Sequence, residues 1–433
     1  MTALADLRVL LRLRDFRRLF AVRMVSQAGD GMFQVGLATL FFFSPQSQGT
    51  AASIAVAFTI LLAPFTIVGP WAGVLLDRWR RRQVLVVVNL MRVVLTLAVA
   101  GTILVSGIGP AIYVLALTIL SLNRFLLAAL SASLPQVVDG PQLLTANALV
   151  PTLGAAAAGV GGLAGILVGL AVPEGIARDA TSLGVASVFF VGASVIAAGF
   201  PAARLGPSPA TVPDAGPLRS DLAHLGRGLA EGARFLVRRR TPAQALVVMG
   251  VHRFLYGVTF VASILISRNL LSTGSAADTG LGVFATVLAA TAVGFGAAIV
   301  LTPTVAARIG PRAWIVVCLL LACGSQLVLV ATMTHASMLV CAVALGLAAQ
   351  GAKIAVDTIV QRDTPDEFRG RAFAFYDVLY NSAFIGAAAL AAVTLPDKGY
   401  SRPMFVVLAA AYALTALAFG RWGARVARTV TDA

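Results

Sequence analysis

The sequence GVLLDRWRRR at residues 73–82 places four arginines and one aspartate between two long apolar segments, residues 51–76 and 84–105. Each segment exceeds the ~20 residues that an α-helix needs to cross the hydrocarbon core of a bilayer. A charged side chain in the middle of that core costs about 2.5–3.5 kcal/mol on insertion scales. Five such charges close together therefore belong to a loop at the membrane surface. The stretch predicts two transmembrane helices joined by a short loop.

The rest of the chain repeats this pattern of apolar segments and charged loops. Of its 433 residues, 59% are hydrophobic and 12% are charged, whereas soluble domains carry about 25% charged residues. This composition excludes a soluble globular protein and predicts an all-α membrane protein. Apolar runs broken by charged or turn residues predict twelve spans, at residues 24–43, 51–76, 84–105, 111–133, 146–172, 183–203, 243–266, 279–307, 313–333, 337–360, 372–395 and 404–420.

Basic residues are concentrated in alternate loops. On the side that holds the N-terminus lie 24 of the 33 Lys and Arg residues, and five more lie within spans. The other side holds only Arg178, Arg268, Lys398 and Arg402. Cytoplasmic loops of membrane proteins carry an excess of Lys and Arg. We therefore expect both termini and the long central loop to be cytoplasmic. The net charge of +15 then reflects membrane orientation, and no nucleic-acid partner is expected.

The spans fall into two sets of six, which indicates an internal duplication. The loop after the eighth span matches the loop after the second, because Arg308 aligns with Arg78 and Arg312 with Arg82, whereas Ala307 replaces the aspartate. The predicted organisation is a cytoplasmic amphipathic segment at 1–23, a six-helix bundle at 24–203, a cytoplasmic loop with an amphipathic helix at 204–242, a second six-helix bundle at 243–421 and a cytoplasmic tail at 422–433.

The loop at residues 73–82 resembles the signature Gly-x-x-x-Asp-Arg-x-Gly-Arg/Lys-Arg/Lys of the major facilitator superfamily. The matching residues are Gly73, Asp77, Arg78, Arg81 and Arg82, whereas Arg80 stands in place of the second glycine. The resemblance covers the entire chain and implies twelve transmembrane helices in two pseudo-symmetric six-helix bundles. It also implies that this loop is a cytoplasmic latch, with Asp377 of the eleventh span as its gating contact.

Three further stretches are similar to members of the superfamily. Asn123 and Arg124 in the fourth span are similar to the site where the superfamily often carries a buried arginine tied to proton coupling. The glycine-rich fifth span resembles that of the antiporters, although it lacks their Gly-Pro pair. Residues 14–30 resemble the subgroup that includes macrolide and enterobactin exporters. These resemblances imply export without fixing the cargo.

Few ionisable residues lie within the predicted spans, and an ionisable residue there normally faces a cavity or a partner. We set Arg23 and Arg92 aside because they are placed near the cytoplasmic ends of their spans. The resemblance implies that spans one, four, seven and ten surround a central cavity. Each of these spans carries at least one ionisable group, namely Asp30, Arg124, Arg253, and Lys353 with Asp357.

Helical spacing groups Gln27, Asp30 and Gln34 on one face of the first span. Asp30 is the first candidate for a proton carrier, because burial away from water favours the protonated form of a carboxylate. The alternative is that Asp30 only forms hydrogen bonds at the cytoplasmic gate.

Two further groups of residues are candidates for the cavity. His252, Arg253 and Tyr256 lie within about one turn, and His252 is a second proton candidate because histidine titrates near neutrality. The alternative for His252 is a satisfied hydrogen-bond donor. Lys353 and Asp357 are four residues apart and can pair, either in the cavity or only to hold the helix against its neighbours.

No metal triad, Ser-His-Asp set or phosphate-binding loop occurs in the sequence, so we expect neither an enzyme nor a cofactor. The expected function is proton-coupled efflux of a hydrophobic or amphipathic small molecule by antiport and alternating access. One alternative is the export of an organic anion, a siderophore or a lipid held by Arg124 and Arg253. A second alternative is a membrane scaffold or sensor whose charges within spans are locked in pairs.

The expected surroundings of the protein follow from this function. Its partners are the lipid bilayer, a small-molecule substrate and protons, and the energy source is a proton gradient. We expect a monomer in the plasma (inner) membrane of a bacterium.

Overall fold

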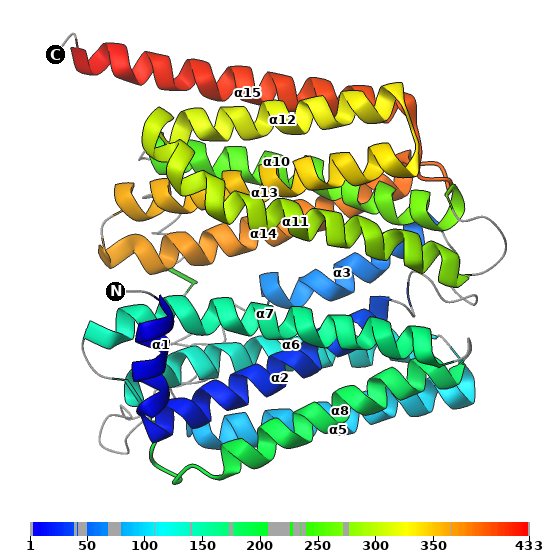
Figure 1. Ribbon diagram of the computed structural model, residues 1–433, viewed down its shortest axis with the longest axis vertical. Helices are drawn as coiled ribbons and strands as arrows, with labels where there is room; N and C mark the ends of the chain where they lie inside the picture. Colours follow the sequence, from blue (N-terminus) through cyan, green and yellow to red (C-terminus); the bar gives the residue numbers. More distant parts are fainter. Residues whose placement is uncertain are drawn as a thin grey trace. The chain divides into compact units, whose positions relative to one another are not determined.

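All secondary-structure elements in the described part of the chain are helices (Figure 1). The structure is a computed structural model that describes residues 3–38, 41, 50–67, 79–107, 109–138, 141–172, 176–206, 226–227, 234, 240–271, 277–364 and 366–431. Its helices are α1 (Ala3–Arg12), α2 (Arg14–Ala38), α3 (Ala51–Ile67), α5 (Arg81–Ser106), α6 (Pro110–Ser133), the short 3-10 helix η3 (Leu134–Gln136), α7 (Pro141–Ala171), α8 (Ile176–Ala198), α10 (Arg240–Asn269), α11 (Ala277–Ile309), α12 (Pro311–Ala331), α13 (His335–Asp363), α14 (Asp366–Thr394) and α15 (Arg402–Thr431).

Ten of the described helices are long and apolar enough to cross a membrane, and they run from α5 to α15. Each of the twelve predicted spans overlaps a described helix. The two remaining spans correspond to α2, which carries several charges, and to α3, whose described part has 17 residues. The all-helical fold is therefore confirmed, whereas the number of twelve spans stays a prediction.

The described helices form two compact units. The first comprises residues 1–41 and 63–226, and the second comprises residues 42–62 and 227–433. In the first unit α5 packs against α6 and α8, and in the second α12 packs against α13 and α15. Likewise α2 packs against α7, and α10 packs against α14 (Figure 1). Three helix contacts of the first unit thus have counterparts in the second, and the internal duplication stays a prediction.

The outward faces of these helices are apolar. Val105, Val188, Val300 and Val393 are between 68% and 87% exposed. Water is a poor solvent for such a surface, whereas lipid tails are as apolar as these side chains. The exposed valines therefore indicate that lipid surrounds the bundles.

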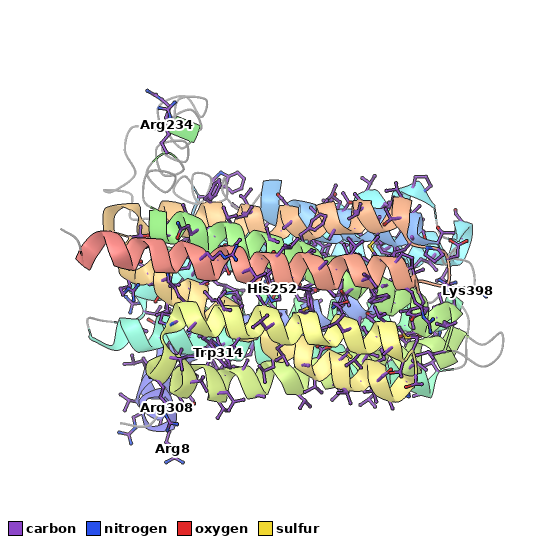
Figure 2. The ribbon with its side chains drawn as sticks, turned by 90° about the horizontal axis from the view of Figure 1, so that it is seen from above. Arg8, Arg234, His252, Arg308, Trp314 and Lys398 are labelled. Carbon is purple, nitrogen blue, oxygen red and sulfur yellow. The ribbon has the colours of Figure 1, made fainter. Side chains whose placement is uncertain are left out.

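Two loops that the sequence analysis assigns to opposite sides of the membrane lie at opposite ends of the second unit (Figure 2). Figure 2 shows Arg308 and Lys398 at opposite ends of its helices. Arg308 comes from an arginine-rich loop and Lys398 from the arginine-poor side. At the Arg308 end, Gly310 has a φ of 85°, a conformation that favours glycine. Pro311 then opens α12, where its missing N–H costs no helical hydrogen bond.

Glycines allow α2 and α7 to approach until their backbones touch. A Cβ atom added to Gly161 of α7 would lie 1.8 Å from the Ala28 carbonyl oxygen of α2, and one added to Gly31 would lie 1.8 Å from the Ala158 carbonyl oxygen. Small residues drive helix association in membranes because they permit this close approach. The glycine-rich fifth span therefore has a packing role within the first unit.

Replacing Gly161 with alanine should lower the thermal stability of the purified protein, because α2 and α7 must move apart to accommodate the methyl group. The matched control is Gly159→Ala on the same helix, where an added Cβ meets no atom within 4 Å. We expect this control to be as stable as the parent or slightly more stable, since alanine favours the helix over glycine. Equal unfolding temperatures for the two variants in detergent would contradict the packing.

Candidate functional site

Asp30 of α2 and Arg92 of α5 form a buried ion pair in the first unit. Asp30 is 1% exposed and Arg92 is fully buried. An unpaired charge in such a place is strongly destabilising, so each group depends on the other. The pair thus joins two helices at a point that the protein shields from both water and lipid.

Polar and aromatic groups from three helices surround the pair. Gln27 Nε2 donates a hydrogen bond to Asp30 Oδ2 over 3.0 Å. Arg92 Nη1 donates to Ser26 Oγ over 3.0 Å. The Arg92 guanidinium also lies 3.7 Å from the centroid of the Phe190 ring of α8, which is a cation–π contact. The carboxylate and the guanidinium therefore have further partners besides each other.

Arg92 is the functional candidate that the sequence analysis missed. Its predicted place near the end of a span is wrong, because α5 begins at Arg81 and a rise of 1.5 Å per residue puts Arg92 about 16 Å along the helix. The need for a basic partner to balance the charge of Asp30 could have identified Arg92 from the sequence. Asp30 is the one acidic residue in the first six predicted spans, so it needs a basic partner at a similar depth.

The other predicted residues of the first unit differ in their relation to Asp30. Arg124 is half-buried and adds a favourable electrostatic interaction with the Asp30 carboxylate, while its neighbour Asn123 is buried. Gln34 was predicted to share the environment of Gln27 and Asp30, but it is exposed. The spacing of residues along a helix determines the direction in which each side chain points, but it does not determine which neighbouring helix packs against that side chain. Of the two glutamines predicted on the same helical face as Asp30, only Gln27 contacts it.

Lys353 and Asp357 of α13 form the predicted ion pair in the second unit, with 2.8 Å between Nζ and Oδ2. The Lys353 side chain is 35% exposed and that of Asp357 is 26% exposed, in contrast to the buried pair of the first unit. Lys353 Nζ also lies 5.6 Å from the centroid of the Tyr376 ring of α14. The pair therefore lies on an accessible part of α13, next to α14.

Arg253 of α10 is surrounded by aromatic rings. Its guanidinium carbon lies 4.2 Å from the centroid of the Tyr380 ring and 4.3 Å from that of Phe384, both on α14. The Tyr256 ring is 5.7 Å away. Among the described residues no carboxylate pairs with Arg253, so its charge is balanced only by the faces of these rings. An arginine in this setting can accept an anionic group from a ligand.

The predicted group of His252, Arg253 and Tyr256 does not form one site. His252 is 1% exposed and lies edge-on to the Tyr412 ring of α15, with 5.5 Å between the ring centroids. Arg253 points instead to the aromatic rings of α14. Neighbouring residues on a helix point in directions about 100° apart, so His252 and Arg253 contact different helices. His252 therefore belongs to the interior of the second unit.

The predicted latch is only partly covered by the structure, because Gly73, Asp77 and Arg78 lie outside the described residues. Arg81 Nη1 donates to the Ala132 carbonyl in the last turn of α6 over 2.9 Å. Carbonyl groups at a helix C-terminus lack intrahelical partners and carry partial negative charge. Arg81 therefore ties the start of α5 to the end of α6.

The other residues of the predicted latch have contacts within their own units. Arg82 Nη2 donates to the Ala198 carbonyl at the end of α8 over 2.8 Å, so it ties α5 to α8 in the same way. In the second unit Asp377 is exposed, and its carbonyl accepts a hydrogen bond from Asn381 over 2.7 Å. The gating role of these residues stays a prediction.

Two mycobacterial proteins are similar to this chain over most of its length. An uncharacterized MFS-type transporter of Mycobacterium tuberculosis is 36% identical over 413 residues, which cover 94% of this chain and 90% of that protein. An uncharacterized MFS-type transporter of Mycobacterium bovis gives the same values. This chain belongs to the major facilitator superfamily (MFS). No family model matches it.

Solved structures agree with the MFS fold. The peptide transporter POT superimposes with a TM-score of 0.71 at 13% identity, over 95% of this chain and 94% of that one. The nucleoside transporter NupG gives 0.64 at 12% identity, over 93% and 98%. At such low sequence identities, the similarity to these structures shows the fold alone. The MFS protein is thus a multi-pass membrane transporter and not an enzyme, and the more specific resemblance to macrolide and enterobactin exporters stays a prediction.

Removing the partner of Asp30 should destabilise the MFS protein more than removing both charges. Arg92→Met leaves a buried carboxylate without its contact, a change that costs about 3–5 kcal/mol. The double variant Asp30→Leu/Arg92→Met should recover much of this loss, because both charges are replaced by apolar groups of similar size. Thermal unfolding in detergent measures the difference. A double variant that unfolds at or below the temperature of Arg92→Met would contradict the role of the pair.

Proposed function

We propose that this MFS protein exports a hydrophobic or amphipathic small molecule in exchange for protons, by alternating access. The proposal includes twelve spans, cytoplasmic termini and a bacterial plasma membrane. Twelve spans and cytoplasmic termini are supported by the alternation of arginine-rich and arginine-poor loops. A bacterial plasma membrane is supported by the mycobacterial relatives.

The observation that carries the proposal is the buried Asp30–Arg92 pair. Asp30 contacts Arg92 and is also held electrostatically by Arg124. The carboxylate can be neutralised either by these arginines or by a proton. A proton on Asp30 releases Arg92, whose guanidinium then needs other partners in the first unit. Proton binding is thereby linked to the contacts between α2 and α5, which provides a physical basis for coupling.

Alternating access requires that these contacts differ between two states of the transporter. A proton shifts the balance between the states only by the difference in its affinity for them. In one state Asp30 pairs with Arg92, and in the other it holds the proton. We propose that substrate binding favours the first state, so that the transporter exchanges a proton for a substrate molecule.

Asp30→Asn tests this coupling because asparagine keeps the size of the side chain and its hydrogen-bonding ability but cannot take up a proton. A ligand-stabilisation screen of amphipathic molecules at two pH values first supplies a substrate. In proteoliposomes, we expect Asp30→Asn to lose substrate accumulation driven by a proton gradient while it retains exchange of substrate without a gradient. Asp30→Glu is the control and should keep gradient-driven transport. Normal gradient-driven accumulation by Asp30→Asn would remove Asp30 from the mechanism.

A second candidate function is the export of an organic anion. The arrangement of Arg253 favours it, because aromatic rings and no described carboxylate surround this guanidinium. Arg124 fits an anion less well, since it already interacts with Asp30. Charge reversal at Arg253 should abolish the binding of anionic substrates, because it replaces their cationic partner with a negative charge. The Kd of neutral substrates should change by no more than about twofold, which corresponds to a few tenths of a kcal/mol. The binding constants of an anion and of its neutral analogue give the result.

A non-transporting scaffold or sensor predicts instead that charges within spans are locked in pairs. Asp30 with Arg92 and Lys353 with Asp357 agree with this expectation. Arg253 does not, because its described contacts are to aromatic rings. The scaffold would show no flux in reconstituted vesicles under any gradient.

A further inference from the structure

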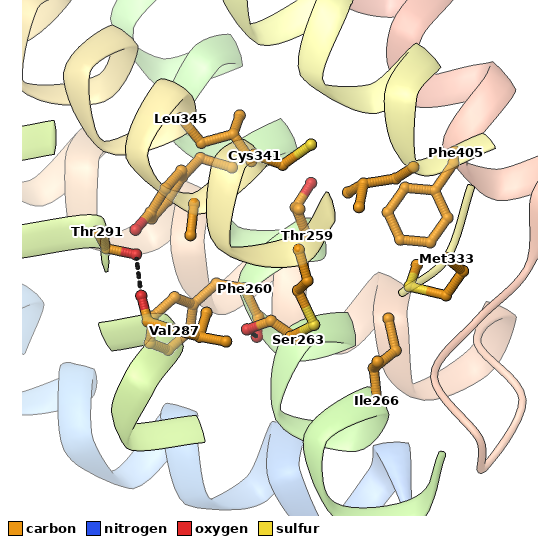
Figure 3. A pocket seen from close by; sticks show the side chains of 14 residues that line it. Thr259, Phe260, Ser263, Ile266, Val287, Thr291, Met333, Cys341, Leu345 and Phe405 are labelled. Atoms are coloured by element: carbon orange, nitrogen blue, oxygen red, sulfur yellow. Dashed lines mark hydrogen bonds between the residues drawn. The ribbon is translucent and has the colours of Figure 1, made fainter. Parts of the chain in front are cut away.

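A pocket lies inside the second unit between α10, α11 and α13, with contributions from α12 and α15 (Figure 3). The lining includes Ile266 of α10, Val287 of α11, Leu345 of α13 and Phe405 of α15. These side chains make the pocket predominantly apolar.

Three of the four hydroxyl groups that line the pocket donate to carbonyl groups of their own helix, and Thr259 Oγ1 also donates to Gln326 Oε1 of α12 over 3.4 Å. Thr259 donates to the Leu255 carbonyl, and Ser263 donates to the Phe260 carbonyl. Thr291 Oγ1 donates to the Val287 carbonyl over 2.8 Å, as the dashed line in Figure 3 shows. Among the residues that the structure describes, no Asp, Glu, Lys, Arg or His side chain lines the pocket. A charged group would be poorly solvated there, so the pocket suits an uncharged apolar body.

The pocket is elongated along α10. The α10 residues that line it run from Tyr256 to Ile266, and ten residues of helix extend about 15 Å. On α13 the lining runs from Met338 to Leu345, or about 10 Å. Met333 and Met338 also line it, and methionine side chains adapt to ligands of irregular shape. A lining that follows α10 over this length offers contacts to an extended chain.

Arg253 lies one helical turn before Tyr256, the first α10 residue that lines the pocket. Arg253 and Tyr256 are three residues apart on α10 and therefore lie on the same side of the helix. Tyr256 lines the pocket, and its ring lies 5.7 Å from the Arg253 guanidinium carbon. Phe260 also lines the pocket, and its ring centroid lies 5.8 Å from that of Phe384, which contacts Arg253. Two aromatic residues thus connect a cation to the apolar pocket.

We infer that Arg253 and this pocket form one binding site for an amphipathic organic anion with an extended apolar chain. The anionic group pairs with the Arg253 guanidinium, and the chain lies along α10 between Tyr256 and Ile266. The inference rests on the proposed function and specifies its substrate class. The same chemistry belongs to an exported single-chain anion and to an acidic lipid of the bilayer.

Photo-crosslinking tests the site with two probes that differ only in their head group. One probe is a straight-chain carboxylate with a diazirine near the end of its chain, and the other is the corresponding alcohol. In purified, reconstituted protein we expect the carboxylate to label α13 around Met338 and Cys341 several-fold more than the alcohol does. Val340, on the same helix but 66% exposed, reports labelling from the surrounding lipid and should not distinguish the probes.

Two substitutions separate the head-group site from the chain site. Arg253→Gln should remove the preference for the carboxylate while the labelled positions stay the same. Ala342→Phe fills the pocket and should reduce labelling at Met338 and Cys341 several-fold without changing labelling at Val340. Val287→Phe fills the pocket from α11 and replaces Ala342→Phe if that variant unfolds. Equal labelling by both probes in the parent protein, or labelling that both filled variants retain, would overturn the inference.

Competition distinguishes the two sources of the ligand. Excess single-chain carboxylate should reduce the labelling if the site serves an exported anion, whereas excess acidic phospholipid should reduce it if the site holds a bilayer lipid. Failure of both competitors would also overturn the inference. The proposed function is tested separately: a parent protein with gradient-driven transport but no pocket labelling would refute only the binding site. Pocket labelling without any proton-driven transport would refute only the coupling.

Discussion

The hydrocarbon core of a bilayer contains no water that could solvate a charge or a backbone polar group. Charged side chains there must find partners within the protein, and Asp30 and Arg92 satisfy each other between α2 and α5. The same constraint explains why every described element is a helix, since a helix satisfies its own backbone groups. Because the charged groups within the membrane must be paired, any change in their pairing also changes how the helices pack, and such charges can therefore take part in transport.

The two units handle internal charge differently. In the first, the Asp30 carboxylate and the Arg92 guanidinium are buried together in a network that joins three helices. In the second, Lys353 and Asp357 are partly exposed, and Arg253 lies against aromatic rings, one of which also lines an apolar pocket. We propose that the two units differ in role accordingly, with proton binding in the first unit and substrate recognition in the second. An internal duplication permits it, because two copies of one helix arrangement can diverge in their side chains.

Much of the fold could be predicted from the sequence, because hydrophobic length and loop charge act locally along the chain. Every predicted span overlaps a helix, and the i,i+4 pair of Lys353 and Asp357 forms as its spacing indicates. The contacts between helices could not be predicted in the same way. They depend on how each helix is rotated and which neighbour it meets, so the partnership of Arg92, the separation of His252 from Arg253, and the pocket all emerge only from the structure.

We propose that Asp30 exchanges its pairing with Arg92 for a proton. Infrared difference spectroscopy of the reconstituted protein between alkaline and acidic pH detects this exchange, because a protonated carboxyl group has its own C=O stretching band. We expect such a band in the parent protein and its loss in Asp30→Asn, with other carboxyl bands unchanged. An identical difference spectrum from the two proteins would show that Asp30 keeps one protonation state and that no proton replaces Arg92 as its partner.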